Sequence, residues 1–319
     1  MSGQRRLLLA AALVAAFVAC LGLAGCGGSE TRPVDPTPPN PFAAFAVGRD
    51  DAFEVATWNL RNFATDAGAD EVALAAQAIR ALGCDLVAVQ EIAESGRFNE
   101  LLAQLPDHSG VQATSDRYQN LGFVWLDSTV TLNSLGEIRP QMDNASRPFP
   151  RWPLVVEITW RGHDLAVINN HYKCCGDGTL QAGDPDDEET RRLEASEILD
   201  QHIRDAYPDQ AVILLGDLND RLDDVPANNI FSPFLARPEE YRFADLAVAT
   251  GPSTGWSWGP GSSHLDHILV TAPLFPAVEA AGASCATVRL DQALRSGEYR
   301  DLLSDHAPVV LVLPGALLP

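Results

Sequence analysis

The sequence predicts an α/β protein, a four-layered α/β sandwich in which two packed, mostly antiparallel β-sheets are flanked by helices. Two kinds of segment predict it. Short apolar runs, rich in Val and Ile and bounded by Gly, Asn or Asp, are typical of buried strands. Amphipathic helical segments interrupt these runs, which favours helices outside the sheets. The expected strands cover residues 53–58, 85–90, 165–169, 211–216, 265–270 and 307–311, and residues 121–135 resemble a hairpin.

Two segments are predicted to be helices. Residues 70–82 place apolar side chains at near-helical spacing, and Gly83 ends the segment. A second helix is expected to begin at Asp184 as N-cap, with Pro185 in its first turn and acidic residues through Glu189. Its inner face would hold Leu193, Ala195, Ile198, Leu199, His202 and Ile203, which gives His202 a structural or surface role.

The N-terminus predicts export. Arg5 and Arg6 precede an apolar stretch over residues 7–21, which is the pattern of a secretory signal. The residues Leu-Ala-Gly-Cys at 23–26 resemble the lipobox of bacterial lipoproteins, which implies lipidation of Cys26. We therefore expect a signal peptide at 1–25, a Pro- and Gly-rich tether at 26–50 and a domain at 51–319, held outside the cytoplasm by the lipid anchor. The alternatives are an ordinary secreted protein or an uncleaved anchor.

The charge of the chain restricts its partners. The chain carries 22 basic and 43 acidic residues, a formal net charge of −21. This background field repels polyanions, so a nucleic-acid substrate would need a bound metal cation and a local basic patch. No run after the signal approaches the ~20 apolar residues of a membrane span. We expect a monomer that touches the membrane only through its anchor.

Four cysteines remain in the expected domain. They are Cys84, Cys174, Cys175 and Cys285, and they allow three complete disulfide pairings among which sequence cannot choose. In an exported protein we expect a bridge that involves Cys174 or Cys175 and stiffens the loop after His171. The alternative is that both thiols are reduced and buried.

Short polar clusters occur at the ends of the expected strands. Each cluster alone is a weak signal, but six in order, each beside an apolar run, indicate one active site gathered from many strand ends. They resemble the motifs of the endonuclease/exonuclease/phosphatase superfamily of metal-dependent phosphoesterases, and the resemblance spans residues 53–313. The motifs are Thr57-Trp58-Asn59, Val89-Gln90-Glu91, Asn169-Asn170-His171, Gly216-Asp217-Leu218-Asn219, Ser263-His264-Leu265-Asp266 and Ser304-Asp305-His306.

The resemblance implies a divalent-metal site with Mg²⁺ or Mn²⁺ as cofactor. Such ions prefer hard oxygen ligands and keep several waters. Glu91 would be the principal metal ligand, with Asn59 and Asp305 beside it. The alternatives are structural roles: an exposed surface acid for Glu91, and turn or strand caps for Asn59 and Asp305.

The resemblance also implies catalytic roles. Asp217 would orient or deprotonate the attacking water, and Asn219 would position that water or the phosphate. His171 and His306 would donate hydrogen bonds to the phosphoryl oxygens, while Asp266 would hold the tautomer and charge of His306. The alternative for Asp217 and Asn219 is a simple Asx-turn.

The remaining polar residues have less specific interpretations. Asp220, Asp223 and Asp224 are assigned to turns, and His264 and His267 are expected to face away from Asp266, although His264 could touch substrate. Many nucleases of the superfamily have a Glu that supports the first His. This chain offers only Gln119 or Asn120 there, which puts the protonation of His171 in doubt.

Candidate substrate-binding residues are Lys173, Arg117 and Trp258. Lys173 is the only lysine of the chain and follows His171 by two residues. It would pair with a substrate phosphate, or else be a solvated loop charge. Trp258 or Trp256 would stack on a base, although at least one of them is expected in the core. Further basic candidates are Arg61, Arg147 and Arg191.

Three functions remain open from sequence. The first is a metal-dependent phosphodiesterase that cleaves nucleic acid, most simply an extracytoplasmic endonuclease-like enzyme. The second is a phosphoesterase for small or lipid substrates, such as a sugar-phosphate phosphatase or a sphingomyelinase-like enzyme. The third is a catalytically silent binding lipoprotein on the same fold.

Overall fold

The computed structural model describes residues 39–65, 68–113, 118–141, 146–259, 261–295 and 297–319. These residues belong to one unit, which begins at Pro39 rather than at Asp51 as expected. Residues 40–48 pack on the unit: Phe42 is fully buried, Asn40 donates to the carbonyl of Gln77, and the amide of Val47 donates to Leu82 O. This part of the expected tether is therefore folded. The predicted signal peptide, with Cys26, lies outside the described residues.

The first sheet has the strand order β11-β12-β1-β2-β4-β3. Only the β1–β2 pair is parallel among its paired strands, and the others are antiparallel. The strands are β1 (Ala52–Asn59), β2 (Leu86–Ile92), β3 (His108–Gln112), β4 (Asn120–Leu126), β11 (Ser284–Thr287) and β12 (Val309–Pro314).

The second sheet has the order β5-β6-β7-β8-β10-β9. Its parallel pair is β7–β8, and its other paired strands are antiparallel. The strands are β5 (Val130–Glu137), β6 (Leu154–Trp160), β7 (His163–His171), β8 (Val212–Asp217), β9 (Tyr241–Phe243) and β10 (Asp266–Thr271). The two sheets together confirm the predicted mostly antiparallel pair.

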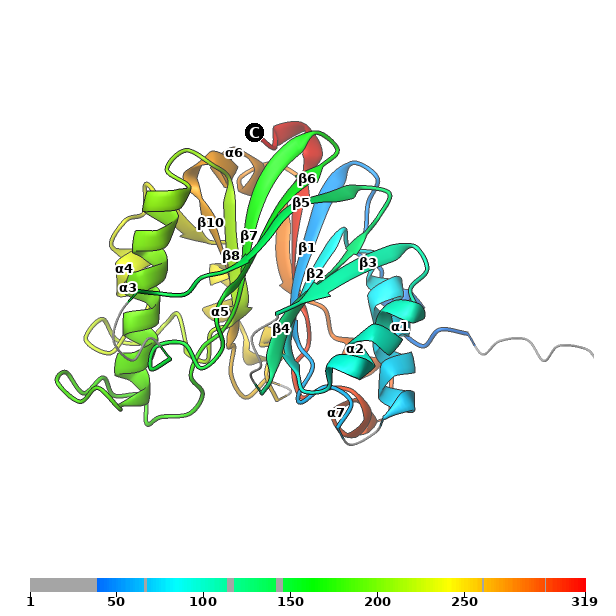
Figure 1. The fold of residues 1–319 in the computed structure, drawn as a ribbon, viewed down its shortest axis with the longest axis horizontal. Helices are drawn as coiled ribbons and strands as arrows, with labels where there is room; N and C mark the ends of the chain where they lie inside the picture. Colours follow the sequence, from blue (N-terminus) through cyan, green and yellow to red (C-terminus); the bar gives the residue numbers. More distant parts are fainter. Residues whose placement is uncertain (1–38, 66–67, 114–117, 142–145, 260, 296) are drawn as a thin grey trace, which may run out of the picture. The chain divides into compact units, whose positions relative to one another are not determined.

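The sheets lie face to face with helices on their outer sides, as Figure 1 shows for α1 and α2 beside the first sheet and α3 beside the second. Alternating side chains make this layering possible, because residues on one strand face opposite sides. Phe53 and Val55 of β1 belong to the core between the sheets, whereas Ala56 and Trp58 belong to the core under α1 and α2. The four-layered α/β sandwich predicted from sequence is confirmed.

The helices have the bounds α1 (Ala69–Leu82), α2 (Ser95–Ala103), α3 (Glu188–Ala206), α4 (Ser232–Leu235), α5 (Leu246–Ala249), α6 (Phe275–Val278) and α7 (Glu298–Leu302). Short 3₁₀ turns cover Ala43–Phe45, Ser253–Gly255, Ala272–Leu274, Leu290–Gln292 and Gly315–Leu317. Within the described residues, no helix is both long and apolar enough to cross a membrane.

Two sequence-based expectations about these elements were wrong. The second helix begins after Asp187, not Asp184, because the Asp187 carboxylate accepts the amide of Thr190 and so caps the first turn. The run at 121–135 is not a hairpin, because β4 belongs to the first sheet and β5 to the second. The short turn between them carries the chain from one layer to the other.

The topology gathers strand ends at one edge of the sandwich. The carboxyl ends of β1, β2, β7 and β8 meet there, and β10 and β12 begin there because they run antiparallel to β8 and β1. Gly216 permits the close approach of β7 and β8 at this edge. Its φ is +144°, and a Cβ there would lie 2.0 Å from the carbonyl oxygen of Asn170.

Candidate active site

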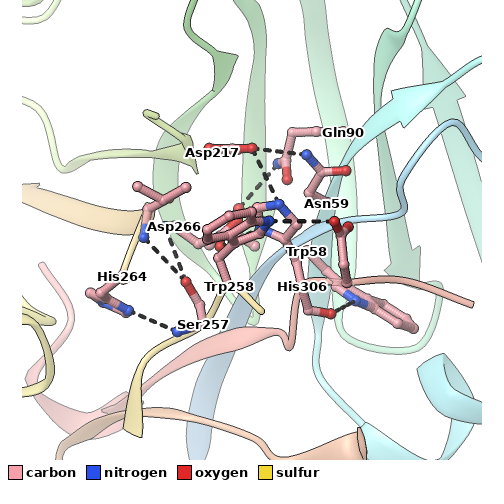
Figure 2. Close-up of polar contacts among 12 residues, drawn as sticks. Trp58, Asn59, Gln90, Asp217, Ser257, Trp258, His264, Asp266 and His306 are labelled. Atoms are coloured by element: carbon pink, nitrogen blue, oxygen red, sulfur yellow. Dashed lines mark hydrogen bonds and ion pairs between the residues drawn. The ribbon is translucent and has the colours of Figure 1, made fainter. Parts of the chain in front are cut away.

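The polar residues predicted from six separate motifs converge at this edge. Figure 2 shows several of them pointing toward one another from both sheets. β1 supplies an amide and β2 a carboxylate. β7 supplies an imidazole and β8 a second carboxylate. The start of β10 supplies a third carboxylate, and the residues just before β12 supply a second imidazole. The converging residues are Asn59, Glu91, His171, Asp217, Asp266 and His306.

Asn59 links the two carboxylates that face each other across the sheets. Its Nδ2 donates to Glu91 Oε1 at 3.1 Å and to Asp217 Oδ2 at 2.8 Å. Its Oδ1 accepts the amide of Arg61 at 2.8 Å. In this arrangement Asn59 presents its nitrogen to the acidic side chains, so it positions Glu91 and Asp217.

Glu91 is held in an unusual backbone conformation. Its φ is +62°, and the β2–β4 register shifts between Val89 and Ile92, so a bulge aims its side chain into the site. Its Oε2 accepts the amide of Asn62 at 2.8 Å. Non-glycine residues with positive φ cost stability and are retained where surrounding structure enforces them, commonly at functional sites.

Asp217 is almost completely buried among other ionisable groups. Burial raises the pKa of this carboxyl to about 7, as do nearby Asp266 and Glu91, while His306 and the amide of Asn59 act in the opposite direction. Near neutral pH the carboxyl can therefore accept or release a proton, which suits a group that activates water.

His306 forms a buried ion pair with Asp266. Its Nδ1 lies 2.7 Å from Asp266 Oδ2, and its Nε2 lies 3.7 Å from Asp217 Oδ2. Burial alone would lower the pKa of His306, but Asp266 and Asp217 raise it to about 10. His306 is therefore an imidazolium at neutral pH, with Nε2 directed at the centre of the site.

His171 has the opposite protonation state. Its Nε2 lies 3.6 Å from Asp217 Oδ2, but its Nδ1 is buried without a hydrogen-bond partner among the described residues. Burial lowers the pKa of His171 well below its ordinary value, and the positive charges of Arg151 and His306 lower it further. No carboxylate among the described residues supports Nδ1, so burial and the two positive charges keep the imidazole ring of His171 neutral.

The donor set fits a divalent cation. Glu91, Asp217 and Asp266 bring three carboxylates to one edge, and Asp266 Oδ1 is buried without a partner among the described residues. Burial raises the pKa of Asp217 most, and repulsion by Asp266 and Glu91 adds to the rise, so a bound cation would relieve part of it. Glu91 is half-exposed and offers carboxylate oxygens of the kind that Mg²⁺ and Mn²⁺ prefer.

The other predicted site residues lie around this centre. Asn219 Nδ2 donates to Tyr172 O. The backbone amide of Asn219 donates to Asp217 Oδ1, which forms an Asx-turn that fixes Asp217. Trp258 is partly exposed, and its Nε1 donates to Asp305 Oδ2 at 3.4 Å. Lys173 Nζ lies 3.6 Å from Glu188 Oε1. The predicted substrate-binding residue Arg117 lies outside the described residues.

Arg151 was missed by sequence reasoning. Burial lowers the pKa of its guanidinium, while Glu91, Asp217 and Cys174 act to raise it, which places its charge beside the site. It precedes β6 in a segment without a distinctive motif, and no sequence signal singled it out. By contrast, the candidate Arg147 is bound to Glu194 at 2.6 Å.

A buried amide bridge supports the site from behind and was also missed. Gln90 Nε2 donates to Thr57 Oγ1 at 3.1 Å and to Asn169 Oδ1 at 2.8 Å. Asn169 Nδ2 in turn donates to the carbonyls of Val89 and Gly122. These bonds join the two sheets just behind Asn59 and His171, so they fix the distance between the strand ends. Gln90 and Asn169 both lie inside motifs recognised in the sequence. That position in a motif is the only sequence signal that could have identified them.

A second cluster of histidines lies behind the site. His264 Nε2 and His267 Nδ1 contact Asp245 Oδ2 at 3.0 and 2.6 Å, and all three residues are buried. His267 Nε2 donates to the carbonyl of Asp220 at 2.8 Å. His264 therefore does not face substrate. The carboxylate of Asp220 pairs with buried Arg192 at 2.9 Å, so its assignment to a turn alone was wrong.

A cavity of about 410 Å³ opens beside the candidate catalytic residue His306. Asp305 and His306 form one wall. The other walls include Trp256, Tyr299 and Arg300. Arg300 is exposed and makes no ion pair with any residue that the structure describes, so the cavity has an available positive charge. A cavity of this size accepts a small ligand or one unit of a longer one.

The fold and site together define a hydrolase that acts on phosphoester bonds. The sequence model of the Endonuclease/Exonuclease/phosphatase family matches residues 56–306, and the chain belongs to this family. The resemblance recognised in the sequence is thereby confirmed. Among curated proteins there is no significant match.

Solved structures share the fold at low sequence identity. TDP2 of D. rerio, solved with a single-strand DNA product, is 17% identical with a TM-score of 0.60 over 82% of this chain and 99% of its own. The human Nocturnin catalytic domain, with bound sulfate, is 15% identical with a TM-score of 0.60, covering 83% and 95%. A Bacteroides thetaiotaomicron mannosyl-6-phosphatase is 14% identical with a TM-score of 0.58, covering 82% and 99%.

Proposed function

We propose that the protein is a divalent-metal-dependent phosphodiester hydrolase that cleaves nucleic acid. The observation that carries the proposal is the opposition of charges at the strand ends: the His306 imidazolium, held by Asp266, faces the carboxylate of Asp217 with Glu91 behind it. Hydrolysis of a phosphodiester needs a base for water and positive groups for the phosphoryl oxygens. The site contains both within one group of buried residues.

Each side chain has a separate task in the proposed mechanism. Asp217, with a pKa near 7, accepts the proton of the attacking water. His306 Nε2 donates to a phosphoryl oxygen, and the positive charge of Arg151 offsets the charge that develops there. His171 is neutral, so its Nε2–H contributes a hydrogen bond without adding charge. Glu91 would hold the divalent metal, which neutralises phosphate charge when bound.

Nucleic acid is favoured as substrate by the cavity beside His306. Trp258, which is exposed and bonded to Asp305 of the cavity wall, can stack on a base, and Arg300 can meet a neighbouring phosphate. A TDP2 related in fold was solved with a single-strand DNA product. The net charge of −21 opposes long polyanions, so we propose action on single-stranded segments or chain ends rather than on long duplexes.

A second candidate is a phosphatase for small phosphoesters. The confined cavity and the acidic chain both favour a compact substrate, and a neighbour in fold is a mannosyl-6-phosphatase. Sugar phosphates would use the same Asp217 and His306, with the cavity holding the sugar. No observation on the described residues favours a lipid substrate, such as that of a sphingomyelinase-like enzyme.

Hydrolysis assays separate the candidates. The full chain in detergent is incubated with single-stranded oligonucleotide, supercoiled plasmid, bis-p-nitrophenyl phosphate and mannose 6-phosphate, each with Mg²⁺, Mn²⁺ or EDTA. We expect metal-dependent oligonucleotide cleavage that is lost in His306→Ala and retained in His202→Ala, whose side chain lies on α3. Cleavage of mannose 6-phosphate alone would replace the proposal with the second candidate.

We also propose that the enzyme is a monomeric lipoprotein outside the cytoplasm, anchored through Cys26. The support is the basic, apolar and Leu-Ala-Gly-Cys sequence of residues 5–26. Metabolic labelling with a radioactive fatty acid should mark the wild-type chain and leave Cys26→Ala unlabelled. Light scattering of the purified chain at defined detergent content would test the monomer, and a doubled protein mass would contradict it.

A further inference from the structure

Two adjacent cysteines lie in the loop that follows β7 and its catalytic His171. The Sγ atoms of Cys174 and Cys175 are 2.9 Å apart, and Cys175 is exposed. The four described cysteines are all free thiols, so the expected bridge is not formed, and neither thiol of the pair is buried. We propose that Cys174 and Cys175 form a reversible disulfide with each other, a redox modification site that controls Lys173.

The local backbone brings the two sulfurs together. Cys175 has a φ of +76°, a conformation that non-glycine residues rarely adopt. Buried Arg192 holds it there, because its Nη1 donates to Lys173 O at 2.9 Å and to Cys175 O at 2.8 Å. These carbonyls flank Cys174, so the loop is clamped on both sides while the thiols stay free.

Other pairings are blocked by distance in the fold. Cys84 is buried in the core between α1 and the first sheet, and Cys285 packs against the core between the sheets. Burial raises the pKa of both thiols well above the ordinary value, so they stay protonated and unreactive. Cys285 is partly exposed, as Cys174 is, but it has no neighbouring thiol, because Cys84 is buried in the other core. Cys174 and Cys175 are therefore the adjacent cysteine pair open to a soluble oxidant among the described residues.

The disulfide would be easy to reverse. Cα atoms of adjacent residues are about 3.8 Å apart across a trans peptide, shorter than the ~4.4–6.8 Å of ordinary disulfides. A disulfide between neighbours is therefore strained, and strained or exposed disulfides are reduced readily. Such a bond suits a redox couple rather than a permanent structural link.

The oxidant that we propose is a small disulfide such as glutathione disulfide. The exposed Cys175 thiolate attacks one sulfur of the oxidant, and one glutathione leaves as thiolate. The Cys174 thiolate then attacks Cys175 Sγ and displaces the second glutathione. The two cysteines lose two electrons and two protons, and the oxidant becomes two thiols. The hydrogen bond to Cys174 raises the pKa of Cys175, so the exchange should accelerate with rising pH.

Ring closure acts on Lys173 through one carbonyl group. Lys173 Nζ donates to Cys174 O at 2.8 Å, and this carbonyl belongs to the peptide bond inside the new ring. Closing an eight-membered ring reorients that peptide, so Lys173 loses its 2.8 Å acceptor and keeps only the longer contact with Glu188 at 3.6 Å. Cys174 also lies close enough to Arg151 to influence its pKa, which places the pair beside the site. This part of the inference rests on the proposed function.

The chemical step is tested without any activity assay. The full chain is equilibrated at a series of glutathione to glutathione disulfide ratios, quenched with acid, alkylated and mapped by mass spectrometry. We expect the peptide with Cys174 and Cys175 to change from doubly alkylated to unalkylated and two hydrogens lighter, while Cys84 and Cys285 keep their thiols. Glutathione retained on Cys175, or no change in pure glutathione disulfide, would overturn the proposal.

The control of Lys173 is tested by kinetics on whichever phosphoester the enzyme cleaves. Oxidation removes a charged hydrogen bond to the substrate phosphate, so it should raise KM at least about tenfold and leave kcat nearly unchanged. Lys173→Met should show the raised KM in both redox states, and Cys175→Ser should show the low KM in both. Equal KM values for reduced and oxidised wild type would overturn the control. A chain without phosphoesterase activity would instead refute the proposed function and leave the mass measurement intact.

Discussion

Two buried clusters of this molecule have nearly the same composition and opposite properties. Asp217, Asp266 and His306 form one, and Asp245 with His264 and His267 forms the other; in each, the potential ligand atoms lie within 4.8 Å of one another. We call them the open cluster and the closed cluster. Residue types alone do not distinguish them, so the difference must come from how their polar atoms are satisfied.

In the closed cluster every ring nitrogen has a partner. Both histidines contact Asp245 Oδ2, His267 Nε2 donates to a carbonyl, and His264 Nδ1 accepts the amide of Ser257 at 3.3 Å. Asp245 Oδ1 accepts the amide of Ile268. Although burial disfavours its charge, His267 holds the pKa of Asp245 well below its ordinary value. No atom is left to meet a ligand, so this cluster is structural.

The open cluster leaves polar capacity unused. Asp266 Oδ1 has no partner among the described residues, and His306 Nε2 approaches Asp217 only to 3.7 Å. The pKa of Asp217 is raised rather than lowered, which means that the fold opposes its charge. A cavity adjoins His306. Unsatisfied polar atoms, a raised pKa and an adjacent cavity thus separate the open cluster, which we propose to be catalytic, from the closed one.

The largest expected contrast is produced by Asp217→Asn. Loss of a general base should lower kcat by about 10³-fold. Because burial raises the folded-state pKa of Asp217, stability is lost as pH rises from the ordinary pKa of about 4 to the folded value of about 7, and the neutral Asn should raise the free energy of unfolding by about 1 kcal/mol at pH 8. Urea denaturation in EDTA measures it. Exposed Asp209→Asn is the control and should change neither quantity.

Asp245→Asn should have the opposite effect. It breaks a buried ion pair, so we expect the free energy of unfolding to fall by about 3 kcal/mol. Asp245 contributes stability above its ordinary pKa of about 4, and this contribution is lost as pH falls through its lower folded value. Urea denaturation at pH 6 checks the change. A stable variant with a large loss of kcat would contradict the division between the clusters.

Asp266→Asn should change the dependence of kcat on pH. His306 is an imidazolium below its pKa of about 10, so wild-type activity should decline only above that pH. Without the Asp266 carboxylate the pKa of His306 falls, and the alkaline decline should begin at lower pH, with kcat lower by about 10²-fold. An unshifted alkaline decline would show that Asp266 does not control His306.

The smallest expected effect belongs to His264→Asn. Asn can retain the acceptor that Ser257 N uses but loses the contact to Asp245, so unfolding should become easier by about 1 kcal/mol. The value of kcat should stay within a few-fold of wild type. Thermal denaturation and steady-state kinetics measure both, and a kcat loss as large as that of Asp217→Asn would move His264 into the active site.

Much of the fold was predictable because its signals are local. The runs that became β1, β2, β7, β8, β10 and β12 are apolar stretches whose burial needs no knowledge of their neighbours. The expected start of α3 at Asp184 was wrong, because the carboxylate of Asp187 accepts the amides of Thr190 in the first turn and of Gln181 in the preceding loop. The expected hairpin failed because adjacent strands in sequence joined different sheets.

The sequence by itself determined the types and the order of the candidate catalytic residues. Each motif lies beside its own strand, and the residue types within the motif indicate its chemistry. Tertiary structure decided everything that depends on neighbours distant in sequence. The protonation of His171 and His306, the cation of Arg151 beside the site and the structural role of Asp245 all arise from burial and from charges on other strands. Electrostatic energies depend on distance in space and on solvent exposure, and neither quantity exists until the chain has folded.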